Sequence, residues 1–301
     1  MDPPSEGMLL CDLPKVDLAD TMKEANYTGT EAAEQPPGAF PVADHRRPEW
    51  RLPRGVSRGV WQYVQADHIA EQYDDYFAEN RLFQFDEQVL ARHFTCPGLV
   101  VDLGCGTGRA LVPLARRGFA GLAVDLSQRM LRVVGRKAAA QRLPIHCVQA
   151  NLVELGCIRS GVADYCTCLF STLGMIQGRA NRQQVLLHAR RILKPGGLLV
   201  AHVHNFWYNL FDAPGRRWLA GHLLRWLLRG DGERGDKRFD YRQIPNVFLH
   251  TFTRRELAGA VRAAGFHVKE LIPLSATRQR PLRQRWLLGW LRANGWIVVC
   301  R

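Results

Sequence analysis

The stretch Val100–Arg109, which reads VVDLGCGTGR, decides the fold. Its apolar residues and Asp102 lead into three glycines at alternate positions, and a segment that can form a helix follows. The glycines are Gly104, Gly106 and Gly108. Glycines cluster in this way where the backbone turns sharply and approaches a ligand with no Cβ in between. The stretch predicts a nucleotide-like cofactor at the C-terminal end of the first strand of a parallel sheet.

The spacing of the glycines separates the possible cofactors. A dinucleotide fingerprint requires Gly or Ala at its sixth position. Counted from Gly104, the sixth position is Arg109, which does not match. Counted from Gly106, it is Leu111, which does not match either. A P-loop requires Gly-Lys-Ser/Thr after its glycines, and the stretch has none. The pattern therefore favours a ligand that carries adenosine but no phosphates.

With these residues the chain resembles the class I S-adenosylmethionine-dependent methyltransferases, whose first motif is similar to VVDLGCGTGR. The resemblance continues in sequence order from about Val60 to the C-terminus. The further matching segments are Ala123–Ser127, Ile145–Asn151, Asp164–Phe170, Arg191–Gly197, Thr253–Leu257 and Ala264–Phe266. The resemblance implies S-adenosyl-L-methionine as the cofactor. A tight turn without a ligand is the alternative for the glycines alone, and the later motifs in register weigh against it.

The resemblance also implies the cofactor-binding residues. It places Asp102 beside the methionine moiety, Asp125 at the ribose hydroxyls and Asn151, where many members carry Asp, at the adenine edge. The full predicted set is Tyr73, Asp102, Gly104, Gly106, Asp125, Leu126, Asn151 and Leu169. Three alternatives stay open: Asp102 as an acid that caps the loop amides, Asn151 as the cap of a helix that begins near Leu152, and Tyr73 as part of an aromatic helix packed on the sheet.

The order of elements predicts a doubly wound α/β sheet. Strands are expected near 99–103, 120–124, 145–149, 163–169, 197–204, 266–273 and 296–300, and helices near 61–80, 85–93, 109–117, 127–140 and 180–193. Alternation of strands and helices favours a parallel sheet. The resemblance implies seven strands in the order 3-2-1-4-5-7-6, with the seventh antiparallel, as in a Rossmann-like methyltransferase fold.

The chain is expected to have three parts. Residues 1–48 are predicted to be a disordered acidic tail, since residues 1–45 carry nine acids against Lys15 and Lys23 while the whole chain has a net charge of +13. Residues 49–98 are expected to form a helical cover, and 99–301 a methyltransferase core with lid segments at about 206–245 and 275–294. One hypothesis is that the tail competes with acidic ligands for the basic body; a solvating extension without a role is the favoured alternative.

Composition bounds the partners and the compartment. The sequence has no run of 18 apolar residues, so no membrane span is predicted. The N-terminus lacks a signal-peptide pattern, and the eight cysteines form no Cys-x-x-Cys pair. We therefore expect a cytoplasmic protein with reduced thiols that act as small apolar residues in or beside strands, and no metal site. The basic residues are nearly all Arg, a type that binds nucleic acids well, but they are spread over the whole chain. No RNA-binding module or Asn/Asp-Pro-Pro-Tyr motif is present, so nucleic acid is an unlikely partner, and no obligate protein partner is implied.

The acceptor is expected at the C-terminal ends of the fourth and fifth strands. Methyl transfer from a sulfonium requires alignment and, for an OH or NH acceptor, a base. His202 and His204 share one face of the fifth strand because side chains alternate along it. His204, nearer the edge, is the predicted base; a buried His bonded to a neighbouring helix is the alternative.

Two stretches mix Trp and Leu with Arg at helical spacing, at Arg216–Arg229 and Arg283–Arg292. They could roof an apolar acceptor pocket or lie in a lipid interface, and a lid helix packed on its own domain is favoured over membrane contact. The sequence thus predicts methyl transfer to a small-molecule or lipid-like apolar acceptor. The alternatives are an RNA or protein methyltransferase and a non-catalytic cofactor-binding member.

Overall fold

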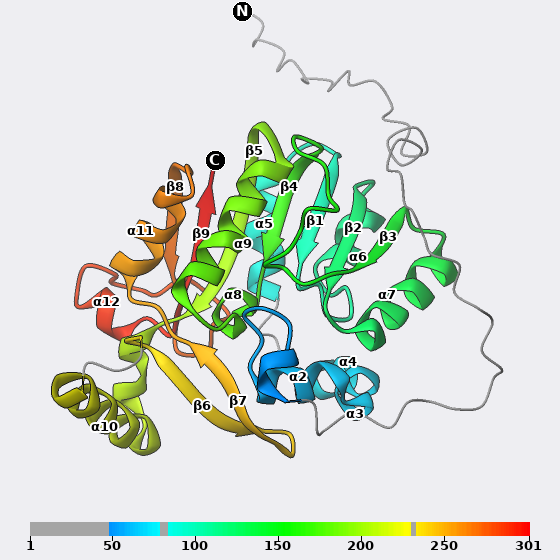
Figure 1. Cartoon of the computed structure of the whole chain (residues 1–301). Coiled ribbons are helices and arrows are strands. Elements are labelled where there is room, and N and C mark those ends of the chain that lie inside the picture. Colours follow the sequence, from blue (N-terminus) through cyan, green and yellow to red (C-terminus); the bar gives the residue numbers. More distant parts are fainter. Residues whose placement is uncertain (1–47, 79–83, 230–232) are drawn as a thin grey trace, which may run out of the picture. The chain divides into compact units, whose positions relative to one another are not determined.

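A seven-stranded sheet with the order β3-β2-β1-β4-β5-β9-β8 forms the centre of the computed structural model, which describes residues 48–78, 84–229 and 233–301 (Figure 1). Strands β1 to β5 pair in parallel, and β9 is antiparallel to both of its neighbours. The strands are β1 (Leu99–Leu103), β2 (Ala120–Asp125), β3 (Ile145–Gln149), β4 (Ala163–Cys168), β5 (Leu193–His204), β8 (Val268–Pro273) and β9 (Gly295–Cys300). The predicted sheet and its order are confirmed. Apart from its last residue, the predicted acidic tail lies outside the described residues.

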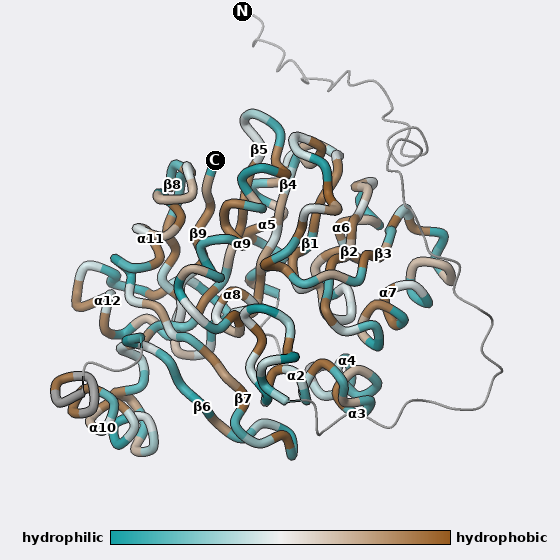
Figure 2. Tube along the Cα trace, in the orientation of Figure 1, coloured by the Kyte–Doolittle hydropathy of each residue, from teal (hydrophilic) through white to brown (hydrophobic). Residues whose placement is uncertain are grey.

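Helices cover both faces of the sheet, as the apolar runs of its central strands require. Helices α9 and α11 pack on one face, and α5, α6 and α7 pack on the other (Figure 1). The strands are correspondingly rich in hydrophobic residues in Figure 2. The helices are η1 (Glu49–Arg51), α2 (Arg58–Gln65), α3 (Asp67–Glu71), α4 (Tyr73–Ala78), α5 (Gln84–His93), α6 (Leu111–Arg116), α7 (Gln128–Gln141), α8 (Thr172–Met175), α9 (Arg179–Ile192), η3 (Phe206–Phe211), α10 (Ala213–Arg229), α11 (Arg254–Ala263) and α12 (Gly289–Arg292).

Three local expectations need correction. The helix expected over 61–80 is broken into α2, α3 and α4, because Ala66 takes an extended backbone conformation between α2 and α3, and its last residues lie outside the described part. The stretch 283–292 is helical only in α12 and otherwise forms turns. Cys147, one of the thiols expected to act as a small apolar residue in a strand, is exposed because it lies on the edge strand β3.

A separate hairpin of β6 (Asp236–Tyr241) and β7 (Ile244–His250) was not predicted. Its turn places Arg242 and Gln243 at φ values of 46° and 67°. Two-residue turns of this left-handed kind usually carry Asn-Gly or Asp-Gly, so Arg-Gln gave no signal.

The hairpin packs closely against the N-terminal helices α2, α3 and α4, which we call the cover (Figure 1). A Cβ on Gly59 of α2 would lie 2.2 Å from the backbone oxygen of Asn246, so only glycine allows this approach. His68 Nε2 lies 3.0 Å from the backbone oxygen of Arg242, and the Arg242 guanidinium donates to Gln72 Oε1 at 3.0 Å. The cover and the hairpin are therefore joined by backbone packing and by hydrogen bonds.

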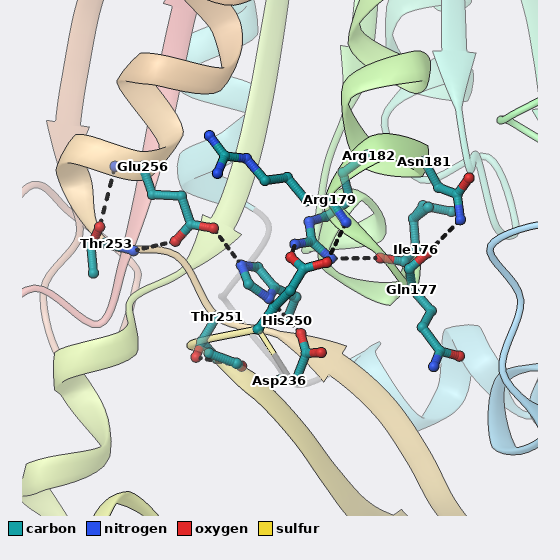
Figure 3. Close-up of polar contacts among 12 residues, drawn as sticks. Ile176, Gln177, Arg179, Asn181, Arg182, Asp236, His250, Thr251, Thr253 and Glu256 are labelled. Atoms are coloured by element: carbon teal, nitrogen blue, oxygen red, sulfur yellow. Dashed lines mark hydrogen bonds and ion pairs between the residues drawn. The ribbon is translucent and has the colours of Figure 1, made fainter. Parts of the chain in front are cut away.

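His250 anchors the other end of the hairpin (Figure 3). The ring is fully buried, with Nδ1 2.7 Å from Asp236 Oδ1 and Nε2 2.7 Å from Glu256 Oε1. Burial alone would lower the pKa of His250, but the hydrogen bonds to the two carboxylates outweigh it and raise the pKa above its ordinary value. Nearby, Arg182 pairs with Glu233. Glu233, Asp236 and His250 lie close enough to hold a metal ion. However, Glu233 is already paired with Arg182, and Asp236 is already hydrogen-bonded to His250.

We expect His250→Gln to lower the free energy of unfolding by about 2 kcal/mol at pH 6, because two charge-assisted hydrogen bonds are lost. The raised pKa means that this stabilisation is complete below the unfolded-state pKa of about 6.5 and is lost as pH rises through the folded-state pKa. Urea titrations at pH 6 and pH 9 measure this difference, which should shrink at pH 9. His146→Gln, at an exposed position of β3, is the matched control. An equal effect of His250→Gln at both pH values would contradict a cationic His250.

Candidate functional site

One pocket at the C-terminal ends of the parallel strands brings together every residue predicted to bind the cofactor. The glycine loop after β1, the acid at the end of β2, the turns after β3 and β4, and the cover all contribute to its lining. The predicted residues that line it are Tyr73, Asp102, Gly104, Gly106, Asp125, Leu126, Asn151 and Leu169. We call it the cofactor pocket.

The glycine loop shapes the floor of the cofactor pocket. The backbone N–H groups of Gly104 and Cys105 both donate to the Val124 carbonyl, at 2.8 and 3.1 Å, which ties the loop to β2. Gly106 has a φ of +53°, and a Cβ built there meets no atom within 4 Å. The space in front of Gly106 is therefore open, as expected for a loop that a ligand approaches closely.

Asp125 fixes this loop from the end of β2. Its Oδ2 accepts from the Gly106 N–H at 2.9 Å, and its Oδ1 accepts from the Ser127 N–H at 2.8 Å. Burial raises the pKa of Asp125, while the hydrogen bonds from Ser127, Gly106 and Leu126 act in the opposite direction. A carboxylate oxygen can accept more than one hydrogen bond, so Asp125 can also receive donors from a ligand in the cofactor pocket.

Asp102 is a second carboxyl group on the cofactor pocket. It is 3% exposed, and its Oδ1 accepts from the Thr167 hydroxyl at 2.6 Å. Burial raises the pKa of Asp102 to about 6; the Thr167 hydrogen bond lowers it and the charge of Asp125 raises it. Ionisation of this buried carboxyl group costs desolvation free energy, and a cationic ligand group would offset that cost.

The cover closes the cofactor pocket on the side of α2 and α4. The Ser127 hydroxyl donates to the Val64 carbonyl at 2.6 Å, and the Thr107 hydroxyl donates to Asp74 Oδ1 at 2.7 Å. Tyr73 lines the pocket and is buried in the apolar cluster that joins the cover to the hairpin. Tyr73 therefore packs against the hairpin rather than on the seven-stranded sheet, and its contact with the cofactor stays a prediction.

The Asn151 amide connects the segment before α2 to the end of β3. Its Nδ2 donates to the Arg54 carbonyl at 2.9 Å, and its Oδ1 accepts from the Val153 N–H at 3.2 Å. The helix expected after Leu152 does not form; turns follow instead. Asn151 therefore caps a turn while lining the pocket, and its contact with adenine stays a prediction.

Sequence reasoning missed Asp86, which lies on α5 and lines the cofactor pocket. It is 4% exposed, its Oδ2 lies 3.1 Å from His202 Nδ1, and its buried Oδ1 has no hydrogen-bond partner. A signal was available, because Asp86 stands three and four residues before Val89 and Leu90 on the apolar side of a helix. An acid at such a position marks a buried polar group.

His204 lies outside the cofactor pocket and lines an adjoining cavity, which we call the β5 cavity. This cavity also contains Asn205, Tyr208, Asn209 and Lys237. His204 Nε2 accepts from Arg278 Nη1 at 2.7 Å. Burial lowers the pKa of His204 well below its ordinary value, and the charges of Arg278, His202 and Lys237 lower it further.

These contacts define the protonation of His204. A guanidinium only donates hydrogen bonds, so the neutral ring carries its proton on Nδ1, which is buried with no partner. His204 is therefore arranged as a hydrogen-bond donor, and its role as a base stays a prediction. The rings of His202 and His204 lie 6.3 Å apart, in agreement with their placement on one face of β5.

The second Trp/Leu stretch is exposed and does not pack as a buried lid. Trp286 is 80% exposed, Trp290 45%, and Leu287 and Leu288 about half. In residues 48–78, 84–229 and 233–301 no helix has the length and apolar character needed to span a bilayer. Contact of this stretch with a membrane surface stays a prediction.

Comparison with known proteins finds a family match over the strands that bear this pocket. Residues 100–197, from β1 into β5, match a family model described as a methyltransferase domain. This segment, which carries the glycine loop and Asp125, is similar to methyltransferase domains. The chain is 31% identical to the ubiquinone biosynthesis O-methyltransferase of Caulobacter vibrioides over 52% of the chain and 59% of that relative. It is 29% identical to the protein of that name from Maricaulis maris over 66% of the chain and 70% of that relative. The chain spans about half the length of several of the curated relatives it matches.

Solved methyltransferases share the fold. The CcbJ methyltransferase from Streptomyces caelestis superposes with a TM-score of 0.56 at 19% identity, over 80% of this chain and 97% of that one. The 1,6-didemethyltoxoflavin-N1-methyltransferase from Burkholderia thailandensis, solved with its substrate and S-adenosylhomocysteine, gives a TM-score of 0.53 at 17% identity, over 77% and 83%.

We expect Gly106→Ala to weaken binding of S-adenosylhomocysteine at least tenfold, because the added methyl group would enter the open space of the cofactor pocket. Titration calorimetry measures the dissociation constant. Gly161→Ala is the control, since Gly161 has a φ of +64° and open space around its Cβ position but lies on an exposed turn. Both variants should lose about 1 kcal/mol of stability, and only Gly106→Ala should lose affinity. Equal affinities for the two variants would show that no ligand approaches Gly106.

Proposed function

We propose that this protein is a methyltransferase, which transfers a methyl group from S-adenosyl-L-methionine to a small-molecule or lipid-like acceptor. The observation that carries the proposal is the convergence of the eight predicted residues on one pocket, with Asp125 and Asp102 both presenting carboxyl groups to it. Two comparisons support a small-molecule or lipid-like acceptor. The Caulobacter and Maricaulis relatives are named ubiquinone biosynthesis O-methyltransferases, and the Burkholderia enzyme was solved with 1,6-didemethyltoxoflavin bound.

The residues present fit this cofactor. Asp125 would accept from the ribose hydroxyls, Asp102 would hold the methionine ammonium, and Asn151 would contact adenine between Leu126 and the cover. The open space at Gly106 leaves room for the ligand against the loop. When bound, the cofactor supplies a methyl group already activated by its sulfonium.

The acceptor would enter from the β4–β5 side, where Leu169 and Phe170 line the cofactor pocket. The cover excludes water from this space and holds the acceptor in line, the contribution that such a displacement requires. For a hydroxyl or amine acceptor, the O–H or N–H bond must break as the bond to the methyl carbon forms. We assign that proton to Asp86, which lines the cofactor pocket and has an unpartnered Oδ1, and we assign His202, which lies beside the other carboxylate oxygen, a positioning role.

Methyl-labelled S-adenosylmethionine, incubated with the protein and a crude cell extract, tests this function. The extract is then separated into organic-soluble, RNA, protein and aqueous small-molecule fractions. We expect label in a small-molecule or organic fraction with the wild-type chain and none with Asp125→Ala, which removes the anchor of the glycine loop and the ribose acceptor. Asp164→Ala, at the other end of the strands, is the control and should retain label transfer. Label in RNA or protein would contradict the proposed acceptor.

We expect Asp86→Asn to lower the rate of label transfer 100-fold or more, the usual contribution of a general base, and to change the affinity for S-adenosylhomocysteine less than twofold. Glu87→Gln, the next residue on α5 and more exposed, should lose less than threefold in rate. A large loss of S-adenosylhomocysteine affinity in Asp86→Asn would instead place this carboxylate at the cofactor.

The role of His202 can be separated from simple packing. His202→Asn keeps an N–H donor near the Nδ1 position, whereas His202→Leu removes it. The Asn variant should recover much of the rate that the Leu variant loses. Equal rates in the two variants would contradict a positioning role.

A further inference from the structure

The Arg278 guanidinium is a partly buried cation that forms no ion pair in the part of the chain that the structure describes. Its Nη1 donates to the neutral His204 ring at 2.7 Å, and its Cζ lies 5.9 Å from the Phe170 ring centroid. Burial lowers the pKa of Arg278, while the charge of Asp86 raises it from beyond ion-pair distance. A charge removed from water without an opposite charge is costly.

Backbone strain adds to this cost. Arg278 has a φ of +57° in the loop after β8. Residues other than glycine seldom adopt this conformation, and it persists where the surrounding structure or a function requires it. Holding this guanidinium beside His204 therefore has two free-energy costs, desolvation of the cation and backbone strain.

Lys237 is a second cation without a carboxylate partner among the described residues. Its Nζ donates to Asn209 Oδ1 at 2.9 Å and lies 5.5 Å from the Trp218 ring centroid. It lines the β5 cavity together with His204, and its charge, like that of Arg278, lowers the pKa of His204. Two cations thus act on one neutral imidazole.

The β5 cavity contains a hydrogen-bond donor that its own residues leave unused. His204 Nδ1–H has no partner, whereas the Asn209 and Asn294 amides, which also line the cavity, already donate to the Phe206 and Ala276 carbonyls. No Asp or Glu lines this cavity. Donors and cations without an acid are the arrangement that binds an anion.

The position of Arg278 connects this cavity to the cofactor pocket. Phe170, under the guanidinium, lines the cofactor pocket, whereas His204 lines the β5 cavity. A molecule bound at Arg278 would therefore reach toward the place where the acceptor's reactive atom must lie.

We propose that the acceptor of this methyltransferase carries an anionic group, a carboxylate or a phosphate. Lys237 in the β5 cavity and Arg278, which is bonded to His204 of that cavity, bind this group, with His204 Nδ1–H as a third donor. This inference rests on the proposed function and adds the charge of the substrate to it. The His204–Arg278 hydrogen bond fixes the guanidinium, and the net charge of +13 favours the approach of anions.

The labelled product provides the first test. After reaction with the crude extract, the low-molecular-weight product is extracted into organic solvent at pH 2 and at pH 9. A carboxylate-bearing product moves to the organic phase at pH 2 and to water at pH 9. A phosphate-bearing product stays in water until phosphatase treatment releases it. Label that partitions equally at both pH values without phosphatase shows a neutral acceptor and overturns the proposal.

Variants supply the second test. Arg278→Gln and Lys237→Gln should each raise the KM for the labelled acceptor fraction about 10- to 100-fold, the range expected for a lost charge-assisted hydrogen bond, and should leave S-adenosylhomocysteine affinity within twofold. Arg280→Gln, in the same loop and exposed, is the control and should match the wild type. Arg278→Gln should also leave the Tm unchanged or raised, because it removes an uncompensated cation.

The outcomes separate the two proposals. If no fraction is labelled by the wild-type protein, the proposed function fails. If label is transferred but KM is unchanged in both variants, only the anionic subsite fails. A lower Tm with unchanged KM would assign Arg278 a structural role. A tenfold loss of S-adenosylhomocysteine affinity would assign the guanidinium to the methionine carboxylate, and would also overturn the proposal.

Discussion

The Asp125 carboxylate is the interaction on which the cofactor pocket depends. One oxygen holds Gly106 of the glycine loop and the other holds Ser127, the residue that caps α7. The same Ser127 hydroxyl bonds to Val64 in the cover. A single, partly buried acid therefore contacts the loop, the start of a helix and the residue that bonds to α2. Its partial desolvation is costly, and the backbone N–H groups that surround it reduce that cost.

Charge is divided between the two halves of the site. The half over β1 and β2 presents Asp102 and Asp125, whereas the half beyond β5 presents Arg278 and Lys237 around His204. Each half keeps charged groups that its own residues do not fully neutralise. Such groups reduce stability in the free protein and become favourable when a ligand of opposite charge is present.

The parts of the structure set by local pattern could be predicted from the sequence. The strand–glycine–helix run at Val100–Arg109 specified β1 and its loop, and Asp125 followed at the spacing of an acid at the end of the next strand. Features that depend on tertiary contacts could not be predicted. The turn at Arg242 and Gln243 lacks the usual residues, and the hydrogen bond between Arg278 and His204 joins residues 74 positions apart. Asp86 lies between these cases, because its place on an apolar helix face was visible but its partner on β5 was not.

The contact between Gly59 and Asn246 limits how the cover can move beside the cofactor pocket. With backbone against backbone, α2 cannot slide along β7, and Arg242 adds hydrogen bonds to α3 and to Gln72 beside it. The hairpin is itself fastened to α11 through His250 and Glu256. Any displacement of the cover away from the cofactor pocket would therefore also have to displace the hairpin, and with it the hydrogen bond between His250 and Glu256 of α11.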